Sequence, residues 1–384
     1  MKKINNLFLL TVASAGGSGI TAVFWFIMAA LLVPSEYGEI QYFLSIAAIG
    51  SVISLIGTPT VVTVYVSKNY KIESTLYFIV LLVAVISSVI VILLFSRFDV
   101  AFLILGLVLN DLALSYLVGK RQYSKYVKYL LVQKLSVVII CLSLFYAIGT
   151  IGIIYGLFIS YLPFTIIIYK GFKETKINFS ELRTRKGFII NNYLINLAGV
   201  FRDHVDKLLI GSLLGFSLLG NFALAVQIYA VFMMFPHIVI RYILPDESRG
   251  IPNTKLKKLT MLISILISIF GVFVAPQIIS LVLPQYTNAI ELIQIMSLGV
   301  VPATLGMILQ TKLLGSEKSK HVLIGRWLAA ITMISGILLL GTVYGTIGLA
   351  FSFILSSTLF AIYLFVNIYL RTSESNNMPK GVEL

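Results

Sequence analysis

Long runs of apolar residues recur from one end of the chain to the other, separated by short polar segments. A run of about 20 apolar residues is what a helix needs to cross the hydrocarbon of a bilayer. Hydropathy predicts about twelve such spans and no soluble domain between them. Their approximate bounds are 7–33, 40–67, 75–95, 100–118, 129–148, 151–169, 187–214, 221–244, 259–282, 289–313, 322–341 and 347–370.

The polar segments alternate in charge along the chain. Loops on one side are rich in Lys and Arg, whereas the opposite loops (PSEYGE, SRFD, GTIG, GFSLLG, PQYTNA and GTVYGT) contain a single cation, Arg97. Because cationic loops stay in the cytoplasm, the pattern predicts a multi-pass protein of the cytoplasmic (plasma) membrane with both termini inside. The basic segment 170–186 is then a cytoplasmic linker.

Composition supports this assignment and excludes other classes. Of the 384 residues, 59% are hydrophobic and 11% are charged, and the mean hydropathy is +0.99. A net charge of +14 would ordinarily suggest nucleic acid, but these cations are concentrated in the loops of one side, so we expect membrane lipids and no nucleic acid as partners.

The sequence contains no motif typical of a catalytic, cofactor-binding or metal-binding site. It has one cysteine, Cys141, and three scattered histidines, and it contains no nucleotide loop, zinc motif or nucleophile elbow. We therefore expect neither an enzyme nor a cofactor or metal site. The start, MKKINN followed by LFLLTV, imitates a secretory signal, but the apolar stretch continues to Val33, which suits a spanning helix better.

The predicted span 187–214 carries a polar stripe. Its members recur at spacings of 4, 3, 4 and 3 residues, which places them on one face of a helix. Ionisable residues at that depth usually face a protein interior or water, because exposure to lipid is costly. We predict that this helix lines a substrate cavity. The stripe consists of Asn192, Asn196, Gly199, Asp203 and Asp206, with Arg202 and Lys207 beside it.

Two internal repeats indicate that the chain has two related halves. The segment 30–49 aligns with 212–231, and GTIG at 149–152 recurs at 345–348. Both repeats preserve the predicted membrane orientation, as in transporters built from parallel repeats. We predict two pseudo-symmetric six-helix bundles, residues 1–169 and 187–370, followed by a cytoplasmic tail, 371–384.

Several short motifs together resemble the polysaccharide-biosynthesis branch of the multidrug/oligosaccharidyl-lipid/polysaccharide (MOP) superfamily. They are LVPSEYG after the first span, Asp206-Lys207-Leu-Leu-Ile-Gly, LLGNF at 218–222, LPQYTNA at 283–289 and GTIG at 345–348. The resemblance implies a V-shaped, all-α, MATE-like fold with alternating access. It also implies a flippase that passes polyprenyl-(pyro)phosphate-linked oligosaccharide from the inner to the outer leaflet, with glycan polymerases or glycosyltransferases as candidate partners.

Cations and amides inside or near the spans are the candidate substrate-binding residues, since Arg and Lys suit a diphosphate. The candidate ion-coupling residues are acids. Simpler interpretations stay open: i,i+4 ion pairs that only neutralise the helix, an acid in span 4 that pairs with a cation of span 7, and arginines that only snorkel to the interface. The substrate-binding candidates are Arg202, Lys207, Asn192, Asn196, Arg241 and Arg326, and the ion-coupling candidates are Asp203, Asp206 and Asp111.

The alternative function is a cation-coupled exporter of drugs or metabolites on the same fold. A flippase for phosphate-linked sugars should gather cations from several helices, whereas an exporter of cationic drugs should be dominated by unpaired acids. The sequence favours the first. A scaffold without transport has no need of charges inside its spans.

Overall fold

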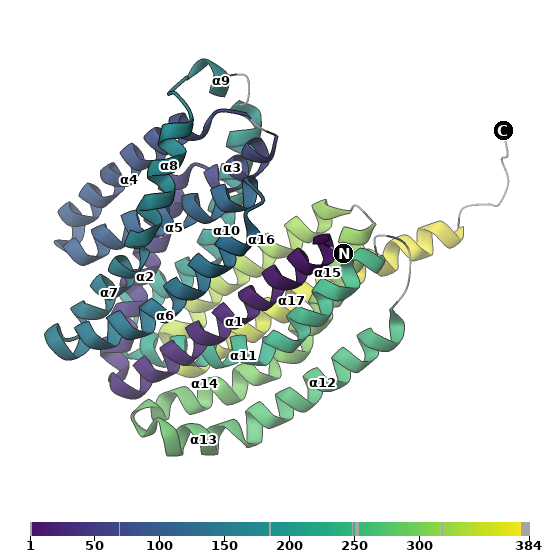
Figure 1. Cartoon of the computed structure of the whole chain (residues 1–384). Helices are drawn as coiled ribbons and strands as arrows, with labels where there is room; N and C mark the ends of the chain where they lie inside the picture. Colours follow the sequence, from purple (N-terminus) through teal and green to yellow (C-terminus); the bar gives the residue numbers. More distant parts are fainter. Residues whose placement is uncertain are drawn as a thin grey trace, which may run out of the picture. The chain divides into compact units, whose positions relative to one another are not determined.

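A computed structural model describes residues 2–377, apart from 69, 184–185, 248, 250–252 and 317. The described residues form helices joined by short turns, without a strand (Figure 1). The helices are α1 (Lys2–Leu31), α2 (Pro34–Leu55), α3 (Thr58–Ser67), α4 (Glu73–Phe95), α5 (Phe98–Gly119), α6 (Tyr123–Ile148), α7 (Ile151–Tyr161), η1 (Leu162–Phe164), α8 (Thr165–Glu174), α9 (Ser180–Arg183), α10 (Lys186–Leu213), α11 (Phe216–Glu247), α12 (Thr254–Phe273), α13 (Ala275–Val282), η2 (Pro284–Tyr286), α14 (Thr287–Leu298), α15 (Val300–Gly315), α16 (Ser319–Gly336), η3 (Ile337–Gly341) and α17 (Thr342–Asn377).

The predicted all-helical membrane architecture is confirmed. Each of the twelve predicted spans corresponds to one helix or to consecutive helices. By length and apolarity alone, the described residues contain eight helices able to cross a membrane, or nine if the bent pair α14–α15 is one span. The striped helix α10 is not among them, and α1 qualifies only as a shorter apolar helix, Gly16–Leu31.

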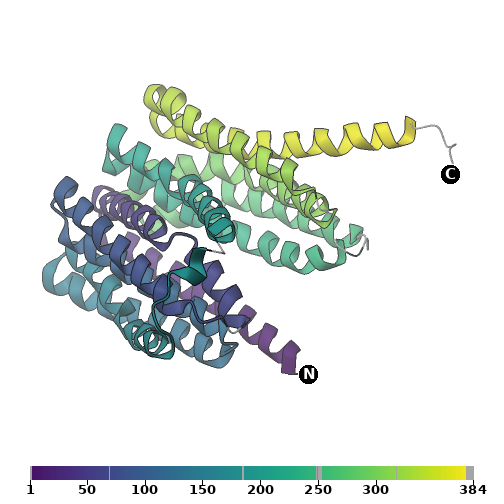
Figure 2. The same cartoon turned by 90° about the horizontal axis from the view of Figure 1, so that it is seen from above.

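The longest of these eight segments, Ser319–Ile368, holds two of the predicted spans. A straight helix of its 50 residues would be about 75 Å long, more than twice the hydrocarbon thickness. The backbone leaves helical geometry at Gly345 (φ 56°, ψ −124°), which divides the segment as predicted. The two arms, α16 and the later part of α17, run side by side in both views (Figures 1 and 2).

Internal contacts divide the described chain into two compact units. Unit 1 comprises Met1–Met28 and Glu39–Leu208, and unit 2 comprises Ala29–Gly38 and Leu209–Leu384. Most of α10 is thus part of unit 1, and the turn from α1 into α2 is part of unit 2. The predicted bundle boundaries at 169 and 187 stay a prediction.

The first internal repeat forms a close helix crossing in unit 2. Gly38 and Gly220 hold the same position in the aligned segments, and each is the fifth residue of its helix. A methyl group added to Gly38 would overlap the carbonyl oxygen of Phe216, and one added to Gly220 would overlap that of Pro34. Since Pro34 also aligns with Phe216, the two contacts are equivalent, as in a self-complementary interface.

The second repeat forms the same turn twice, once in each unit. Gly149 and Gly345 have positive φ angles of 77° and 56°, a conformation that favours glycine. Three residues on, a methyl group at Gly152 or Gly348 would overlap the carbonyl oxygen of the residue eight positions earlier, Leu144 or Leu340. The repeated GTIG sequence therefore specifies a tight reversal between two closely packed helices.

The basic linker is docked onto unit 1 at the first turn of α4. The Thr175 hydroxyl accepts a hydrogen bond from the backbone N–H of Ser74 (3.1 Å). The buried Thr75 hydroxyl accepts one from the N–H of Asn178 (2.8 Å) and donates to the Asn178 carbonyl (3.3 Å). These bonds satisfy the backbone N–H of Ser74 and the N–H and carbonyl of Asn178, which in a flexible linker would be hydrogen-bonded to water.

We expect Thr75→Val to release this linker, because the Asn178 N–H loses its acceptor at a cost of about 1–3 kcal/mol. Limited trypsin digestion should then cut between residues 170 and 186 several-fold faster than in the parent protein. Thr165→Val is the matched control, because Thr165 is exposed and donates only to Leu162 of the preceding turn. Equal cutting rates in all three proteins would show that the linker is held elsewhere.

Candidate functional site

The striped helix α10 lies against a break between α2 and α3. The break has positive φ angles at Ile56 (49°) and Gly57 (73°), and a methyl group at Gly57 would lie 2.6 Å from the backbone nitrogen of Tyr193. Glycine is therefore required where α10 passes. Beside it, the rings of Tyr65 and Phe188 meet edge to face with centroids 5.5 Å apart.

The predicted amides of the stripe lie in this part of α10. Asn192 is half-buried, and its Nδ2 donates to the Phe188 carbonyl of its own helix at 2.8 Å. Asn196 is also half-buried. Half-buried positions of this kind are compatible with residues that line a polar cavity. The role of both asparagines in substrate binding stays a prediction.

The charged part of the stripe contains one described ion pair. Lys207 Nζ lies 3.6 Å from Asp206 Oδ1, which also accepts a hydrogen bond from the Lys207 N–H at 2.8 Å. Both side chains are only 15% exposed, so the ion pair is largely buried. One turn away, His204 Nδ1 lies 3.4 Å from the Ser45 hydroxyl. The side chains of Arg202 and Asp203 lie outside the described residues, as does that of Arg241 on α11.

The other two predicted residues lie in different units. Asp111 of α5, in unit 1, accepts a hydrogen bond from the Asn110 Nδ2 at 2.9 Å. Arg326 of α16, in unit 2, donates to the Gln310 Oε1 at 2.8 Å, and its guanidinium carbon lies 5.7 Å from the centroid of the Phe360 ring. Arg326 is thereby held by α15 and α17 within its own unit.

Unit 1 contains a partly open cavity that no sequence pattern predicts. Its volume is about 170 Å³, and it lies among five helices of the unit. Its wall combines polar and apolar side chains: Thr21, Phe24, Trp25, Leu44, Ala48, Leu103, Leu107, Lys134, Val137, Leu157 and Tyr161.

Lys134 is the charged residue of this wall, and sequence reasoning missed it. It is half-buried in α6 and lies close to α1, because a methyl group at Gly17 would be 3.7 Å from its Cγ. The signal was present: a lysine within the apolar run LLVQKLSVVII, inside a predicted span.

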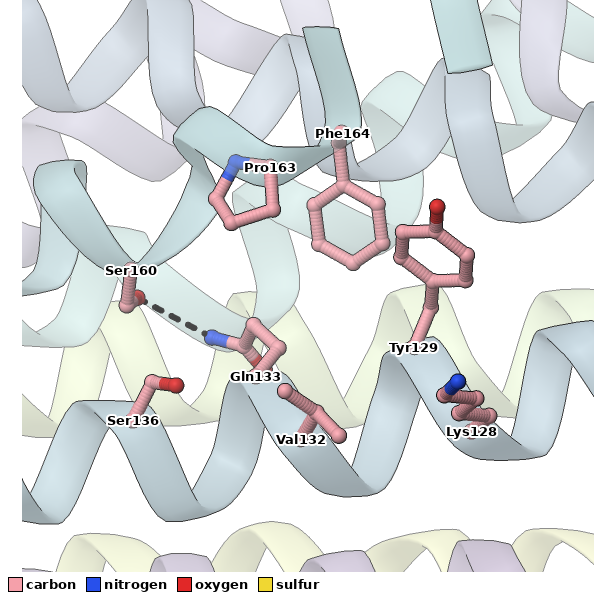
Figure 3. Close-up of a pocket in the computed structure, with 8 residues that line it drawn as sticks. All are labelled: Lys128, Tyr129, Val132, Gln133, Ser136, Ser160, Pro163 and Phe164. Carbon is pink, nitrogen blue, oxygen red and sulfur yellow. Dashed lines mark hydrogen bonds between the residues drawn. The ribbon is translucent and has the colours of Figure 1, made fainter. Parts of the chain in front are cut away.

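A second pocket, of about 250 Å³, is lined by residues of α6, α7 and η1 (Figure 3). Gln133 and Ser160 line it and are the immediate neighbours of Lys134 and Tyr161 in sequence. The Gln133 Nε2 donates to the Ser160 hydroxyl at 3.3 Å, and both side chains are buried. This bond links α6 to α7. Lys128 and Tyr129 of α6 and Pro163 and Phe164 of η1 complete much of the wall.

The sole cation of the non-basic loops, Arg97, is neutralised inside unit 1. Its guanidinium makes a two-pronged contact with Asp99 (2.9 and 2.8 Å) and reaches Glu39 at 2.7 Å. The guanidinium carbon also lies 4.0 Å from the centroid of the Phe43 ring. Arg97 therefore joins the start of α2 to the turn between α4 and α5.

Metal chemistry finds no support in the described part of the chain, where no three His, Cys, Asp or Glu side chains could hold an ion together. The sequence matches no family model, and no curated protein matches it.

Solved structures do match the fold over nearly the whole chain. A lipid II flippase, MurJ, in an inward closed conformation, is 13% identical, with a TM-score of 0.76 over 97% of this chain and 94% of its own. An inward-facing multidrug resistance MATE transporter of the MOP superfamily is 13% identical, with a TM-score of 0.72 over 97% and 100%. The outward-facing form of such a transporter has a TM-score of 0.60, at 13% identity over 97% and 96%. This chain is therefore an all-helical, multi-pass membrane protein with the fold of the MOP-superfamily transporters.

Proposed function

We propose that the protein is a flippase of the plasma membrane for polyprenyl-(pyro)phosphate-linked oligosaccharide. It would carry the polar head from the inner to the outer leaflet by alternating access, for assembly of a cell-surface glycan. The polyprenyl tail would stay in lipid. With no nucleotide-binding motif in the sequence, the energy would come from an ion gradient or from consumption of the flipped product.

The fold supports a transporter, but flippases and drug exporters share it. A further observation is therefore needed to distinguish these two functions. That observation is the presence of cations inside spans of both units. Lys134 on α6 and Lys207 on α10 belong to unit 1, and Arg326 on α16 belongs to unit 2. Cations from several helices suit a substrate that carries phosphate, whereas a cationic drug would be repelled.

We assign the first contact with the phosphate to the charged part of α10. Lys207 would bind phosphate oxygens as a point charge, with Arg202 as a bidentate partner and Asn192 and Asn196 toward the sugar. Asp206 holds Lys207 in place while the site is empty and is the proposed coupling acid, with Asp203 and Asp111 as further candidates. Arg241 and Arg326 would attract headgroups to the protein.

Asp206→Asn and Lys207→Gln should each lower translocation by about tenfold or more, the equivalent of 1.4 kcal/mol. Lipid-linked glycan on the outer leaflet would be measured by labelling intact cells with an impermeant sugar-specific reagent, with inserted protein quantified in parallel. Lys258→Gln is the matched control, because that exposed lysine lies in the first two turns of α12, close to the basic loop.

The same cells should accumulate lipid-linked glycan in the inner leaflet. If both variants translocate at the parental rate, the site assignment is wrong. If deletion of the gene leaves outer-leaflet glycan unchanged while export of a cationic dye is lost, the exporter alternative replaces the flippase.

A further inference from the structure

The second pocket, of about 250 Å³, opens toward the lipid around unit 1. Its wall includes Val132 of α6, which is 51% exposed, and Pro163 of η1, which is also exposed. Both residues lie inside predicted spans, so hydrocarbon surrounds them when the protein is in a bilayer. A ligand would therefore enter this pocket from the membrane and not from water.

The pocket lies beside a helix break that the local sequence specifies. The helix α6 continues unbroken for 26 residues, whereas α7 gives way to the 3₁₀ turn η1 before α8 begins. A proline has no N–H, and its ring disturbs the preceding turn, so a helix is interrupted there. Pro163 and Phe164 lie across the pocket from Tyr129 and Gln133 (Figure 3).

Two hydroxyl groups of the wall have no hydrogen-bonding partner in the described part of the chain. They belong to Tyr129, whose ring contacts that of Phe164 with centroids 5.9 Å apart, and to Ser136. Both side chains are half-buried, and Ser136 lies two turns, about 10 Å, farther into the membrane than Tyr129. A hydroxyl group in an apolar environment costs free energy unless it is hydrogen-bonded, so both groups favour a ligand with polar atoms.

The charge of the wall restricts the kind of ligand. The deeper polar groups are neutral: the Gln133 amide and the Ser160 hydroxyl, which are bonded to each other, and the Ser136 hydroxyl. Lys128 is exposed and precedes the predicted span 129–148, so its ammonium can extend into water. Neutral hydroxyl groups donate and accept hydrogen bonds but do not compensate an ion, and they match the hydroxyl and ester oxygens of an uncharged head group.

The size and the apolar part of the wall suit a lipid. A volume of about 250 Å³ is far more than one water needs, so the pocket has room for a head group of several heavy atoms. Val132, Pro163 and Phe164 provide an apolar surface, along which an acyl chain can pass into the bilayer.

We propose that this pocket binds the head group of an uncharged acylglycerol, with the hydroxyls of Tyr129 and Ser136 as its hydrogen-bonding partners. The site goes beyond the proposed function, because its ligand has neither phosphate nor glycan and binding requires no transport. It also differs from the polar stripe of α10, since none of the stripe's residues lines this pocket.

The proposal can be tested by binding to the purified full-length protein in a neutral maltoside detergent. The protein would be titrated with 1-monooleoylglycerol, and native mass spectrometry would count the bound lipids. We expect one saturable site, whose apparent Kd rises at least tenfold when Tyr129→Phe and Ser136→Ala are combined, because two hydrogen bonds are lost. Val132→Trp keeps both hydroxyls but fills the mouth of the pocket, and it should abolish saturable binding.

Ser143→Ala is the matched control, because Ser143 is exposed on the same helix, two turns beyond Ser136, and does not line the pocket. It should leave the Kd within twofold. Methyl oleate, with the same chain and no hydroxyl group, should bind the parent protein at least tenfold more weakly than 1-monooleoylglycerol. Ser136→Thr guards against a folding defect, since it keeps the hydroxyl and should bind more tightly than Ser136→Ala.

Lys128→Met distinguishes a neutral from a charged head group and should leave the Kd for 1-monooleoylglycerol within twofold. Tighter binding of oleoyl lysophosphatidic acid that is lost in Lys128→Met would assign the pocket to an anionic head group and overturn the proposal. Parental affinity in the double variant, or an equal loss in Ser143→Ala, would also overturn it. Loss of acylglycerol binding with normal glycan translocation would leave the proposed function intact, so the two proposals fail separately.

Discussion

Gly38→Ala and Gly220→Ala should each destabilise unit 2 by about 3 kcal/mol or more, at or above the upper end of the usual cost of overpacking. In both cases the added methyl group meets a backbone carbonyl oxygen, of Phe216 or of Pro34, and not a side chain that can rotate away. The crossing of α2 and α11 therefore has to open. Melting followed by the fluorescence of Trp327, in a Trp25→Phe background, would measure the loss in unit 2.

Gly19→Ala and Gly199→Ala are control variants in unit 1, and their stability would be followed by labelling of the buried Cys141 in the same unit. Both glycines lie within helices, and a methyl group at either position would meet nothing within 4 Å. Alanine favours helix over glycine by up to about 1 kcal/mol, so these variants should be neutral or stabilised. Loss of stability in the controls equal to that at Gly38 and Gly220 would contradict the crossing as described.

Arg97→Ala should have the second large effect, a loss of about 3–5 kcal/mol from unit 1. Asp99 is 3% exposed at its side chain, so removal of the guanidinium leaves a buried carboxylate without its two-pronged partner. The contact with Glu39 contributes little, because that carboxylate is 41% exposed and screened by solvent. Unfolding in mixed micelles can be followed by labelling the buried thiol of Cys141.

Two further variants distinguish the cost of leaving the buried Asp99 carboxylate unpaired from the effect of losing the Arg97 charge itself. Arg97→Ala combined with Asp99→Asn should recover more than half of the lost stability, since the buried charge is then removed with its partner. Glu39→Gln alone should cost no more than about 1 kcal/mol. A double variant no more stable than Arg97→Ala would mean that contact of Arg97 with the Phe43 ring, and not with Asp99, provides the stabilisation.

Periodic and repeated features of the sequence predicted the fold well. Apolar runs of bilayer length gave the twelve spans because lipid leaves a backbone few alternatives to the helix. The GTIG repeat and the aligned pair Gly38 and Gly220 were visible as sequence matches, and the structure gives both their physical reason: backbone approaches that exclude a side chain.

The helix break, the ion pairs of Arg97 and the cavity could not be predicted from the sequence, because each is formed by residues that lie far apart along the chain. Pro59 marks a possible kink within the predicted span 40–67, but nothing near Ile56 and Gly57 shows that α10 passes there. Asp99 and Glu39 look like ordinary loop acids until the fold brings both to Arg97. Lys134 was readable as a charge inside a span, but the cavity that it lines is formed by five helices.

The bent pair α14–α15 shows how a long helical stretch can fit a bilayer. Together with η2 it runs from Pro284 to Gly315, 32 residues, with a 40° bend between Leu298 and Val300. A straight helix of that length would be about 48 Å long, against a hydrocarbon thickness of about 30 Å. Tilting and kinking are the ways in which an overlong span is accommodated, so a variant that straightened this bend would match a thicker membrane.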